Sequence, residues 1–356
     1  MKRYSLKQPF WPRADQAMWR GLLEGGTLLG NVGAGANWAT ETRRGAERDY
    51  GYWLSFVLSA CPEVIGECPA SRVTPERVSA YCRTMGGVAA LTQATRIARL
   101  YTIMRGVYVL LDWRWLAHVR RALDRAARRE GPVRRKHGRL RPSGQLFQAG
   151  LDLLLDARRC NKFSLRLRAA RFRDGLMIAL LAARPLRIRN FAGLRLEYHL
   201  HSVPPGYLID IPGIECKTGQ PIETFVPDEL CPWLEEFLEI HRPILLGRQT
   251  SDYLWINAAG EPYRPGSLSQ RIAKLTRGLF GVSISPHLFR DCAATSIATD
   301  DPEHVMIIAS ILGHTTLRTA ENHYNHARCL EAGRRFQKSI KDRRHHARPI
   351  GRRAST

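Results

Sequence analysis

One segment near the middle of the chain is almost wholly apolar. It runs from Gly175 to Ala183, reads GLMIALLAA and contains no charged residue. A helix that is apolar on every side has to be buried all round. We therefore expect a helix over residues 173–183 at the centre of a folded domain. The pair Arg184–Pro185 should end this helix, because proline has no amide hydrogen and disfavours helical backbone in the residue before it.

The pattern changes after this helix. Apolar and polar residues alternate in three short stretches, 198–203, 206–212 and 221–227. Residues that are typical of turns separate these stretches. A period of two predicts strands, so these stretches indicate a small antiparallel sheet with the Lys-Thr-Gly sequence 217–219 in one of its turns. Elsewhere apolar residues recur every three or four positions, as at 47–60, 74–81, 92–113, 115–129 and 143–154. The expected fold class is mainly α, of the α+β type.

The chain is long enough for two domains. It has 356 residues, and a domain usually holds roughly 100 to 200. A stretch dense in arginine with almost no apolar residue lies between Arg125 and Pro142, and this composition is typical of an exposed linker. The expected organisation is an N-terminal arm that is partly flexible (1–40), a helical domain (41–125), a basic linker (126–142), a mostly helical domain with the small sheet (143–332) and a basic tail (333–356).

The charge of the chain points to a polyanionic partner. Lys and Arg number 55 against 32 Asp and Glu, a formal net charge of +23. A hydrophobic content of 44% supplies packed cores, so the charge belongs to a folded body and not to a disordered basic tail. The N-terminal residues are broken by charge and proline, and no apolar run is long enough to span a membrane. We expect a protein that is neither secreted nor membrane-bound.

Two groups of basic residues are candidate contacts to nucleic-acid phosphates. One group lies on the helix expected over 92–113 and the other in the linker. They are Arg96, Arg99 and Arg105, and Arg134, Arg135 and Lys136.

Metal binding is not expected. The eight cysteines are scattered with no CxxC pair, which is typical of reduced, packed thiols. His199 and His201 are placed on one face of an expected strand, but no carboxylate or cysteine near them in the sequence would complete a metal site. We interpret both as strand-surface residues.

Three separated segments place phosphate-compatible side chains beside apolar ones. The first is 185–190, PLRIRN, with Arg187 between two helices. The second is 286–291, PHLFRD, where His287 and Arg290 share one helix face. The third is 311–314, ILGH, which ends at His314 and is followed by Tyr324.

Together with the turn that carries Lys217, these segments resemble the tyrosine recombinases, also called the phage-integrase family. The family has an arginine in a "GLRIxEL"-like segment, a lysine in a β-turn, then HxxR, LGH and a tyrosine. The resemblance assigns the catalytic roles to Arg187, Lys217, His287, Arg290, His314 and Tyr324, in the family's order. It is strong from residue 173 to 324 and loose over the rest, where the front helices resemble the family's core-binding domain.

Two positions depart from the family's pattern. Asn190 stands where the family often has an acidic residue, so it keeps hydrogen-bonding capacity but lacks a charge that could orient Arg187. Asp291 follows Arg290 where many members have histidine. Neither departure changes a catalytic position, so activity is still expected.

These residue types suit the cleavage of a phosphodiester. Two guanidinium groups bind phosphate oxygens in pairs, which suits Arg187 and Arg290. A tyrosine is a weak nucleophile at its ordinary pKa near ~10, so it needs a base and a cationic site. His287 is the expected base and His314 an added donor to the phosphate, whereas Lys217 would protonate the leaving 5′ oxygen. The scheme uses no metal and no cofactor.

The resemblance implies a site-specific recombinase that cuts and rejoins DNA through a 3′-phosphotyrosyl intermediate, without ATP, to integrate or excise a mobile element. It implies double-stranded DNA with inverted-repeat sites, a homo-tetramer, accessory directionality factors and a bacterial cytoplasmic location at the nucleoid. Residues 329–340 are the candidate segment for docking on a neighbouring protomer. Three alternatives stay open, namely a type IB topoisomerase-like enzyme, a catalytically silent DNA-binding regulator, and a metal-dependent nuclease or transposase.

Overall fold

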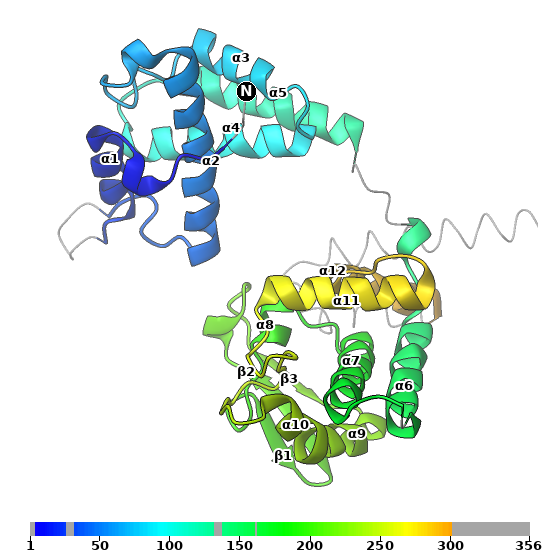
Figure 1. Cartoon of the computed structure of the whole chain (residues 1–356). Coiled ribbons are helices and arrows are strands. Elements are labelled where there is room, and N and C mark those ends of the chain that lie inside the picture. The colour runs from blue at the N-terminus through cyan, green and yellow to red at the C-terminus, as the bar shows by residue number, and fades with distance from the viewer. Residues whose placement is uncertain (1–3, 26–31, 132–136, 161, 301–356) are drawn as a thin grey trace, which may run out of the picture. The chain divides into compact units, whose positions relative to one another are not determined.

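The computed structural model of the chain describes residues 4–25, 32–131, 137–160 and 162–300. The chain divides into two compact units, one up to Arg134 and the other from Arg135 onward. The two units are described separately below, and Figure 1 labels their elements.

The first unit is built of helices. Thr74 begins one of them as predicted, because its hydroxyl oxygen accepts a hydrogen bond from the amide of Arg77 at 3.3 Å, and Pro75 and Glu76 follow in the first turn. The described elements are η1 (Gln8–Phe10), α1 (Arg13–Leu23), α2 (Thr40–Ala60), η2 (Pro62–Val64), α3 (Pro75–Thr84), α4 (Ala90–Val107) and α5 (Arg114–Glu130).

The residues expected to form a flexible N-terminal arm contribute to the core of this unit. Trp19 and Leu22 of α1 are 5% and 1% exposed. The loop that follows packs on the end of α1, where a Cβ on Gly33 would lie 2.4 Å from the carbonyl oxygen of Gly21. The arm was expected to be partly flexible, and its described residues pack on the first unit, where the glycines permit a close backbone approach.

A buried ion pair also ties α1 to the rest of the first unit. Asp15 and Arg72 are both fully buried and lie 2.5 Å apart, and the hydroxyl of Tyr50 donates to the same carboxylate. Burial raises the pKa of Tyr50 well above its usual value, and the negative charge of Asp15 adds to this effect.

The helix expected over 92–113 is shorter than predicted. It forms α4, which ends at Val107, and the indole of Trp113 donates a hydrogen bond to the carbonyl of Tyr108 at 3.0 Å. Ile97 and Leu100 are buried as expected, whereas Leu110 is 97% exposed. The apolar spacing continues past the point where the chain turns toward α5, so the pattern alone overstates the length of the helix.

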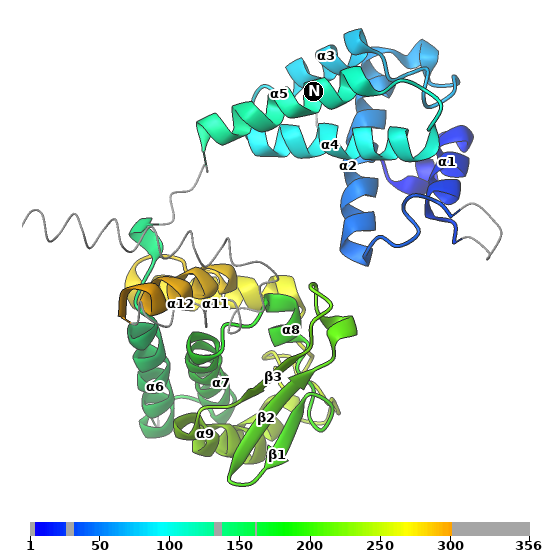
Figure 2. The ribbon, with the colours of Figure 1, turned by 180° about the vertical axis from the view of Figure 1, so that it is seen from behind.

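The second unit combines helices with one small sheet. Strands β1, β2 and β3 follow one another in the sheet, and both pairs are antiparallel, with Leu200 opposite Ile209 and Ile209 opposite Thr224. Figure 2 shows the sheet lying against the helices of the unit. The elements are η3 (His137–Arg139), α6 (Ser143–Arg159), α7 (Leu165–Ala183), α8 (Ile188–Ala192), β1 (Leu200–Val203), β2 (Gly206–Ile211), η4 (Gly213–Glu215), β3 (Ile222–Phe225), η5 (Asp228–Leu230), α9 (Cys231–Glu236), η6 (Phe237–His241), α10 (Arg242–Leu246), α11 (Pro265–Phe280) and α12 (Pro286–Asp300). The predicted fold class is confirmed.

Helix α7 is the centre of this unit, as its sequence predicts. Every residue from 172 to 182 is buried. It packs so tightly against α6 that a Cβ on Gly150 would lie 2.5 Å from the backbone nitrogen of Ala179. The helix begins earlier than expected, at Leu165, where the hydroxyl of Ser164 accepts a hydrogen bond from Leu167.

The expected linker 126–142 is partly structured at both ends. Helix α5 continues to Glu130. At the other end, Arg139 donates to the carbonyl of Ser283 and the amide of Arg141 to the sulfur of Cys292 at 3.4 Å, so these residues belong to the second unit. The proposed phosphate contacts Arg134, Arg135 and Lys136 lie outside the described residues, as does the tail 333–356.

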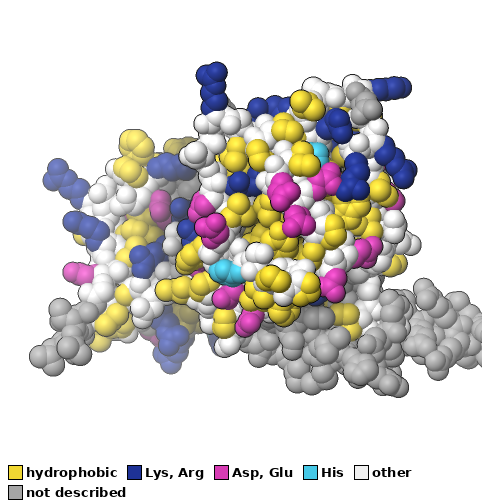
Figure 3. Space-filling model, turned by 90° about the horizontal axis from the view of Figure 1, so that it is seen from below, with side chains coloured by type: hydrophobic (Ala, Val, Ile, Leu, Met, Phe, Trp, Pro, Cys, Tyr) yellow, Lys and Arg dark blue, Asp and Glu magenta, His cyan; other side chains and the backbone are white. Residues whose placement is uncertain are grey.

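The positive charge is unevenly spread over the second unit. Figure 3 views the molecule from the side on which β1 and α9 lie in Figure 1, and acidic and apolar side chains share this face. Between the start of β1 and the end of η6, the exposed acidic residues are Asp210, Glu223, Asp228, Glu229, Glu235 and Glu239. This face is therefore poorly suited to a polyanion. Within the described residues, no helix is both long and apolar enough to cross a membrane.

Candidate functional site

The first site residue, Arg187, lies where the chain leaves the buried helix α7. Pro185 and Leu186 are buried, and Arg187 is the residue that precedes the short helix α8. Its side chain is half-buried at the edge of the core. The segment that ends α7 is short and well packed, and it places the cation Arg187 at the surface.

Arg290 of α12 contacts the same segment. Its guanidinium donates a hydrogen bond to the carbonyl oxygen of Pro185 at 2.6 Å, and the side chain is 7% exposed. Burial and, to a smaller extent, the positive charge of Arg187 lower the pKa of Arg290 to about 10, although the charge of Asp291 opposes the shift. The two guanidinium groups are therefore close enough to repel one another, and a doubly coordinated anion would relieve that repulsion.

The turn that carries Lys217 lies beside α8. Arg187 is near enough to Cys216 for its charge to counteract the rise that burial causes in the thiol pKa. The turn is narrow, because a Cβ on Gly213 would lie 2.4 Å from the carbonyl oxygen of Gly219, whose φ is +70°. Lys217 itself is exposed. Arg187, Arg290 and the turn of Lys217 are thus brought together from segments about thirty and seventy residues apart.

His287 is on the same helix as Arg290. It is exposed in the first turn of α12, three residues before Arg290, which places both side chains on one helix face. His314 and Tyr324 lie outside the described residues. The structure therefore gathers four of the six expected catalytic residues, on α12, the α7–α8 break and one turn.

Asn190 has a role that the sequence did not reveal. Its amide nitrogen lies 3.4 Å from the carbonyl oxygen of Glu215 and 3.7 Å from the sulfur of Cys216, and the side chain is 7% exposed. A carboxylate at this position has no hydrogen to donate to that carbonyl. The departure from the family's acidic residue thus comes with a contact that fastens α8 to the turn of Lys217.

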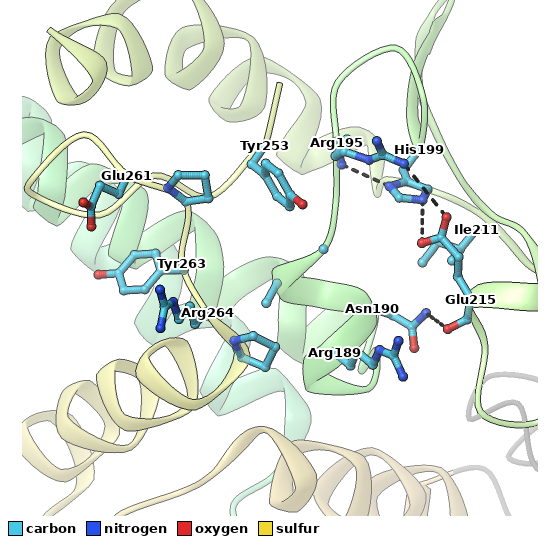
Figure 4. A pocket seen from close by; sticks show the side chains of 14 residues that line it. Arg189, Asn190, Arg195, His199, Ile211, Glu215, Tyr253, Glu261, Tyr263 and Arg264 are labelled. Atoms are coloured by element: carbon cyan, nitrogen blue, oxygen red, sulfur yellow. Dashed lines mark hydrogen bonds and ion pairs between the residues drawn. The ribbon is translucent and has the colours of Figure 1, made fainter. Parts of the chain in front are cut away.

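A polar pocket of about 760 Å³ opens beside these residues. Figure 4 shows Glu215 between His199 on one side and Asn190 on the other, with Tyr253, Tyr263 and Arg264 across the space. His199 is only 2% exposed, so its interpretation as a strand-surface residue was wrong. The residue lies just before β1, and its ring turns inward toward Glu215, a carboxylate that is distant in sequence.

The expected DNA contacts of the first unit differ in their surroundings. The guanidinium of Arg96 lies 3.8 Å from the centre of the Tyr52 ring, so it is engaged within the unit. Arg99 is half-buried, and Arg105 is exposed. Sequence reasoning missed the basic side of α5, although its spacing shows the pattern. The exposed arginines of α5 are Arg114, Arg121, Arg125, Arg128 and Arg129.

Metal ligands were also considered. In the part of the chain that the structure describes, no group of three or more His, Cys, Asp or Glu side chains is placed to hold a metal ion. The seven cysteines in these ranges are free thiols.

Comparisons with known proteins bear on the sequence and on the fold. No family model matches the chain. It is 29% identical over 153 residues to the tyrosine recombinase XerD of Vibrio cholerae, which is 42% of this chain and 48% of that protein. It is 31% identical over 159 residues to XerD of Pseudomonas aeruginosa, which is 44% of this chain and 50% of that protein. The chain spans about half the length of the curated relatives that it matches.

The fold is similar to that of a solved recombinase. XerH site-specific recombinase bound to its difH substrate before cleavage aligns with a TM-score of 0.54 at 15% identity, over 82% of this chain and 79% of that one. The post-cleavage complex of XerH with a palindromic difH substrate gives 0.53 at 15% identity, over 83% and 80%. The chain is thus similar in sequence to the XerD tyrosine recombinases over about half of their length, and it shares the fold of the XerH recombinase.

Proposed function

We propose that this protein is a site-specific recombinase that cuts and rejoins double-stranded DNA through a 3′-phosphotyrosyl intermediate. The observation that carries the proposal is the meeting of Arg187, Arg290 and the turn of Lys217 at one place. A site to which three separate segments bring cations is electrostatically suited to bind an anion. A phosphodiester is the anion that this family of enzymes would meet.

The two arginines stabilise the reacting phosphate. In the transition state the non-bridging oxygens of the phosphate carry additional negative charge, and fixed guanidinium groups bind that charge without reorganising. Arg290 is held by Pro185 and remains a cation at neutral pH, because its pKa is about 10. Removal of one such fixed donor typically costs roughly 10²- to 10³-fold in rate.

The covalent step uses Tyr324, His287 and Lys217. The hydroxyl oxygen of Tyr324 attacks the scissile phosphorus while its proton passes to His287. The bond between phosphorus and the 5′ oxygen breaks, and Lys217 gives a proton to that oxygen, which leaves as a 5′-hydroxyl. His314 donates a hydrogen bond to a phosphate oxygen.

The second step reverses the first with a different strand. A 5′-hydroxyl of the partner DNA attacks the phosphotyrosine, its proton returns to Lys217, and Tyr324 leaves and recovers its proton from His287. The number of phosphodiester bonds is unchanged, so the reaction consumes no nucleotide. No step of this scheme requires a metal ion or a cofactor.

The division of labour between the units is also a proposal. The first unit would act as the core-binding domain and the second as the catalytic domain, with Arg105 and the exposed arginines of α5 supplying much of the salt-dependent affinity. Because the post-cleavage complex of XerH contains a palindromic DNA substrate, we propose inverted-repeat sites here as well. A homo-tetramer would join two sites, with residues 329–340 docking on a neighbour.

The biological setting follows from the substrate. An enzyme of this kind acts on chromosomal DNA, so we place it in the bacterial cytoplasm at the nucleoid. Its task would be the integration or excision of a mobile element, with accessory factors setting the direction.

The test is the capture of the covalent adduct. DNA from both flanks of the protein's own gene carries a nick near each candidate site, so that cleaved product cannot be resealed. It is incubated in EDTA with wild type, with Tyr324→Phe and with Tyr207→Phe, a control tyrosine on β2. Adducts that survive denaturation are then mapped by peptide sequencing. We expect adducts with wild type and the control only, on Tyr324.

Other outcomes identify the alternatives. Binding without any adduct would favour the silent regulator, and loss of cleavage in EDTA would favour a metal-dependent nuclease. On DNA without a nick, resealing of the same strand with no exchange between two DNA molecules would favour the topoisomerase-like enzyme.

A further inference from the structure

The turn that carries Lys217 is fastened through Glu215, two residues before the lysine. One carboxylate oxygen of Glu215 lies 3.3 Å from Nε2 of His199. The other accepts a hydrogen bond from the hydroxyl of Tyr198 at 3.3 Å and lies 4.0 Å from the guanidinium of Arg195. Three neighbouring residues before β1 therefore converge on one side chain of the turn.

The protonation of His199 is defined by its second nitrogen. The backbone amide of Arg195 donates a hydrogen bond to Nδ1 of His199 at 3.2 Å, so Nδ1 must present a lone pair. The ring proton then sits on Nε2, the atom that faces Glu215. Nε2 is buried and has no aligned hydrogen bond to any described residue, so the 3.3 Å approach of Glu215 is its available partner.

The segment that presents His199 is itself tightly folded. The amides of His199 and Leu200 both donate to the carbonyl oxygen of Arg195, and Glu197 has a φ of +61°, which is unfavourable for a residue with a side chain. The ring of Tyr198 lies edge-on to His199, with the ring centres 4.6 Å apart. Arg195 is also paired with Asp252 at 3.7 Å. A strained, multiply bonded loop fixes the position of the imidazole.

Asn190 holds the same part of the turn through its backbone, as described above. Glu215 is thus held at two points. Its carbonyl oxygen is bound by Asn190 of α8, and its carboxylate is bound by the residues before β1. In the same turn, Lys217 is exposed and Ile214 is 95% exposed.

We infer that His199 is a positioning residue for Lys217, which acts through Glu215 to hold the turn where the lysine reaches the leaving oxygen. This inference rests on the proposed function, because it names a residue that supports the general acid of that reaction. A displacement of the lysine by about 1 Å would slow protonation of the leaving group roughly 10²-fold. It would leave DNA binding unaffected, and it would slow the attack of Tyr324 only where the leaving group has to be protonated.

The experiment compares two leaving groups. A nicked DNA substrate is made with either the natural oxygen or a sulfur atom at the scissile 5′ position. A thiolate leaves without being protonated, so the sulfur substrate does not need the general acid. Single-turnover formation of the covalent adduct is measured on both substrates for wild type, Lys217→Ala, His199→Phe, Glu215→Gln and the control His201→Phe on β1.

We expect His199→Phe and Glu215→Gln to react roughly 10- to 100-fold more slowly than wild type on the oxygen substrate and to approach wild type on the sulfur substrate. Lys217→Ala should show the same pattern with a larger loss, and His201→Phe should match wild type on both. A purely structural role of His199 would not restore the wild-type rate on the sulfur substrate, so this recovery distinguishes the two roles.

Two results would overturn the inference. Equal losses on both substrates would mean that His199 supports the fold of the unit and not the lysine, and wild-type rates on oxygen for both variants would mean that the turn does not depend on the pair. If His199→Phe fails to fold, as judged by its unfolding temperature, Glu215→Gln decides. A wild-type protein that forms no adduct on either substrate would refute the proposed function itself, which is a separate outcome.

Discussion

The guanidinium of Arg290 donates a hydrogen bond to the carbonyl oxygen of Pro185 at 2.6 Å, across more than a hundred residues of sequence. Pro185 ends the central helix α7, and Arg187 follows it by two residues. The contact therefore fixes the distance between the two arginines that are proposed to bind the reacting phosphate.

Replacement of Arg290 by lysine should abolish most of the cleavage activity. An ammonium group cannot bond Pro185 and also present a second donor in the plane of the phosphate oxygens. We expect adduct formation to fall roughly 10²-fold, with DNA affinity nearly unchanged. The measurement is single-turnover cleavage, with Arg277→Lys on α11 as the control, since Arg277 bonds the hydroxyl of Ser283. If Arg290→Lys cleaved DNA at the wild-type rate, the proposed role of the Arg290 guanidinium would be contradicted.

Asn190→Asp restores the acidic residue that the family often has, and it should still reduce activity. The new carboxylate can no longer donate to the carbonyl oxygen of Glu215, and it repels that oxygen. We expect a loss of roughly tenfold on a natural substrate and recovery when the leaving group is sulfur. Unchanged or faster cleavage would show that this position serves Arg187 and not the turn of Lys217.

Variants of Arg105 and Arg96, which both belong to α4, should differ in their effects: one should change DNA affinity and the other the stability of the first unit. Arg105 is exposed, so Arg105→Ala is expected to lower the slope of log affinity against log salt by about 0.9. Arg96 stacks on Tyr52, so Arg96→Ala should lower the unfolding temperature and leave the slope unchanged. Filter binding over a range of salt concentrations, beside thermal unfolding, distinguishes the two. Equal slopes for both variants would refute the assignment.

The second unit should lose stability as the solution becomes acidic. Burial lowers the pKa of His241 below 6.5, although Glu236 opposes the shift. For Glu236, burial alone would raise the pKa, but hydrogen bonds from Arg158 and His241 lower it below 4.5. In both cases the unfolded chain binds protons more readily, so the stabilisation is complete above pH 6.5 and declines as the pH falls through 6.5 and then 4.5.

The variant His241→Phe tests this dependence. His241 stacks on Phe172 with ring centres 4.0 Å apart, so phenylalanine keeps the stacking and removes the titrating group. The fall in the unfolding midpoint between pH 7 and pH 5.5 should be smaller in this variant than in wild type. Identical pH profiles would show that another group is responsible.

Much of the fold could be predicted from local patterns. The apolar run 175–183 predicts the buried helix, and alternation predicts the three strands, because both signals depend only on which faces of an element are buried. The burial of α1 was not predicted, because Trp11 packs on Tyr50 and Asp15 pairs with Arg72, and both partners lie outside the arm. The end of α4 was misplaced because a local pattern does not show where a turn to the next helix begins.

For the site, the sequence by itself selected the candidate residues, because motif and spacing single out the arginines, the lysine and the histidines that are proposed to face a phosphate. Only the tertiary structure decided that Asn190 and His199 serve the turn of Lys217. Both act through Glu215, which is distant from each of them in sequence. The packing of α8, the sheet and the turn brings the donor and the acceptor of such a bond together. A pattern of neighbouring residues in the sequence does not reveal contacts of this kind.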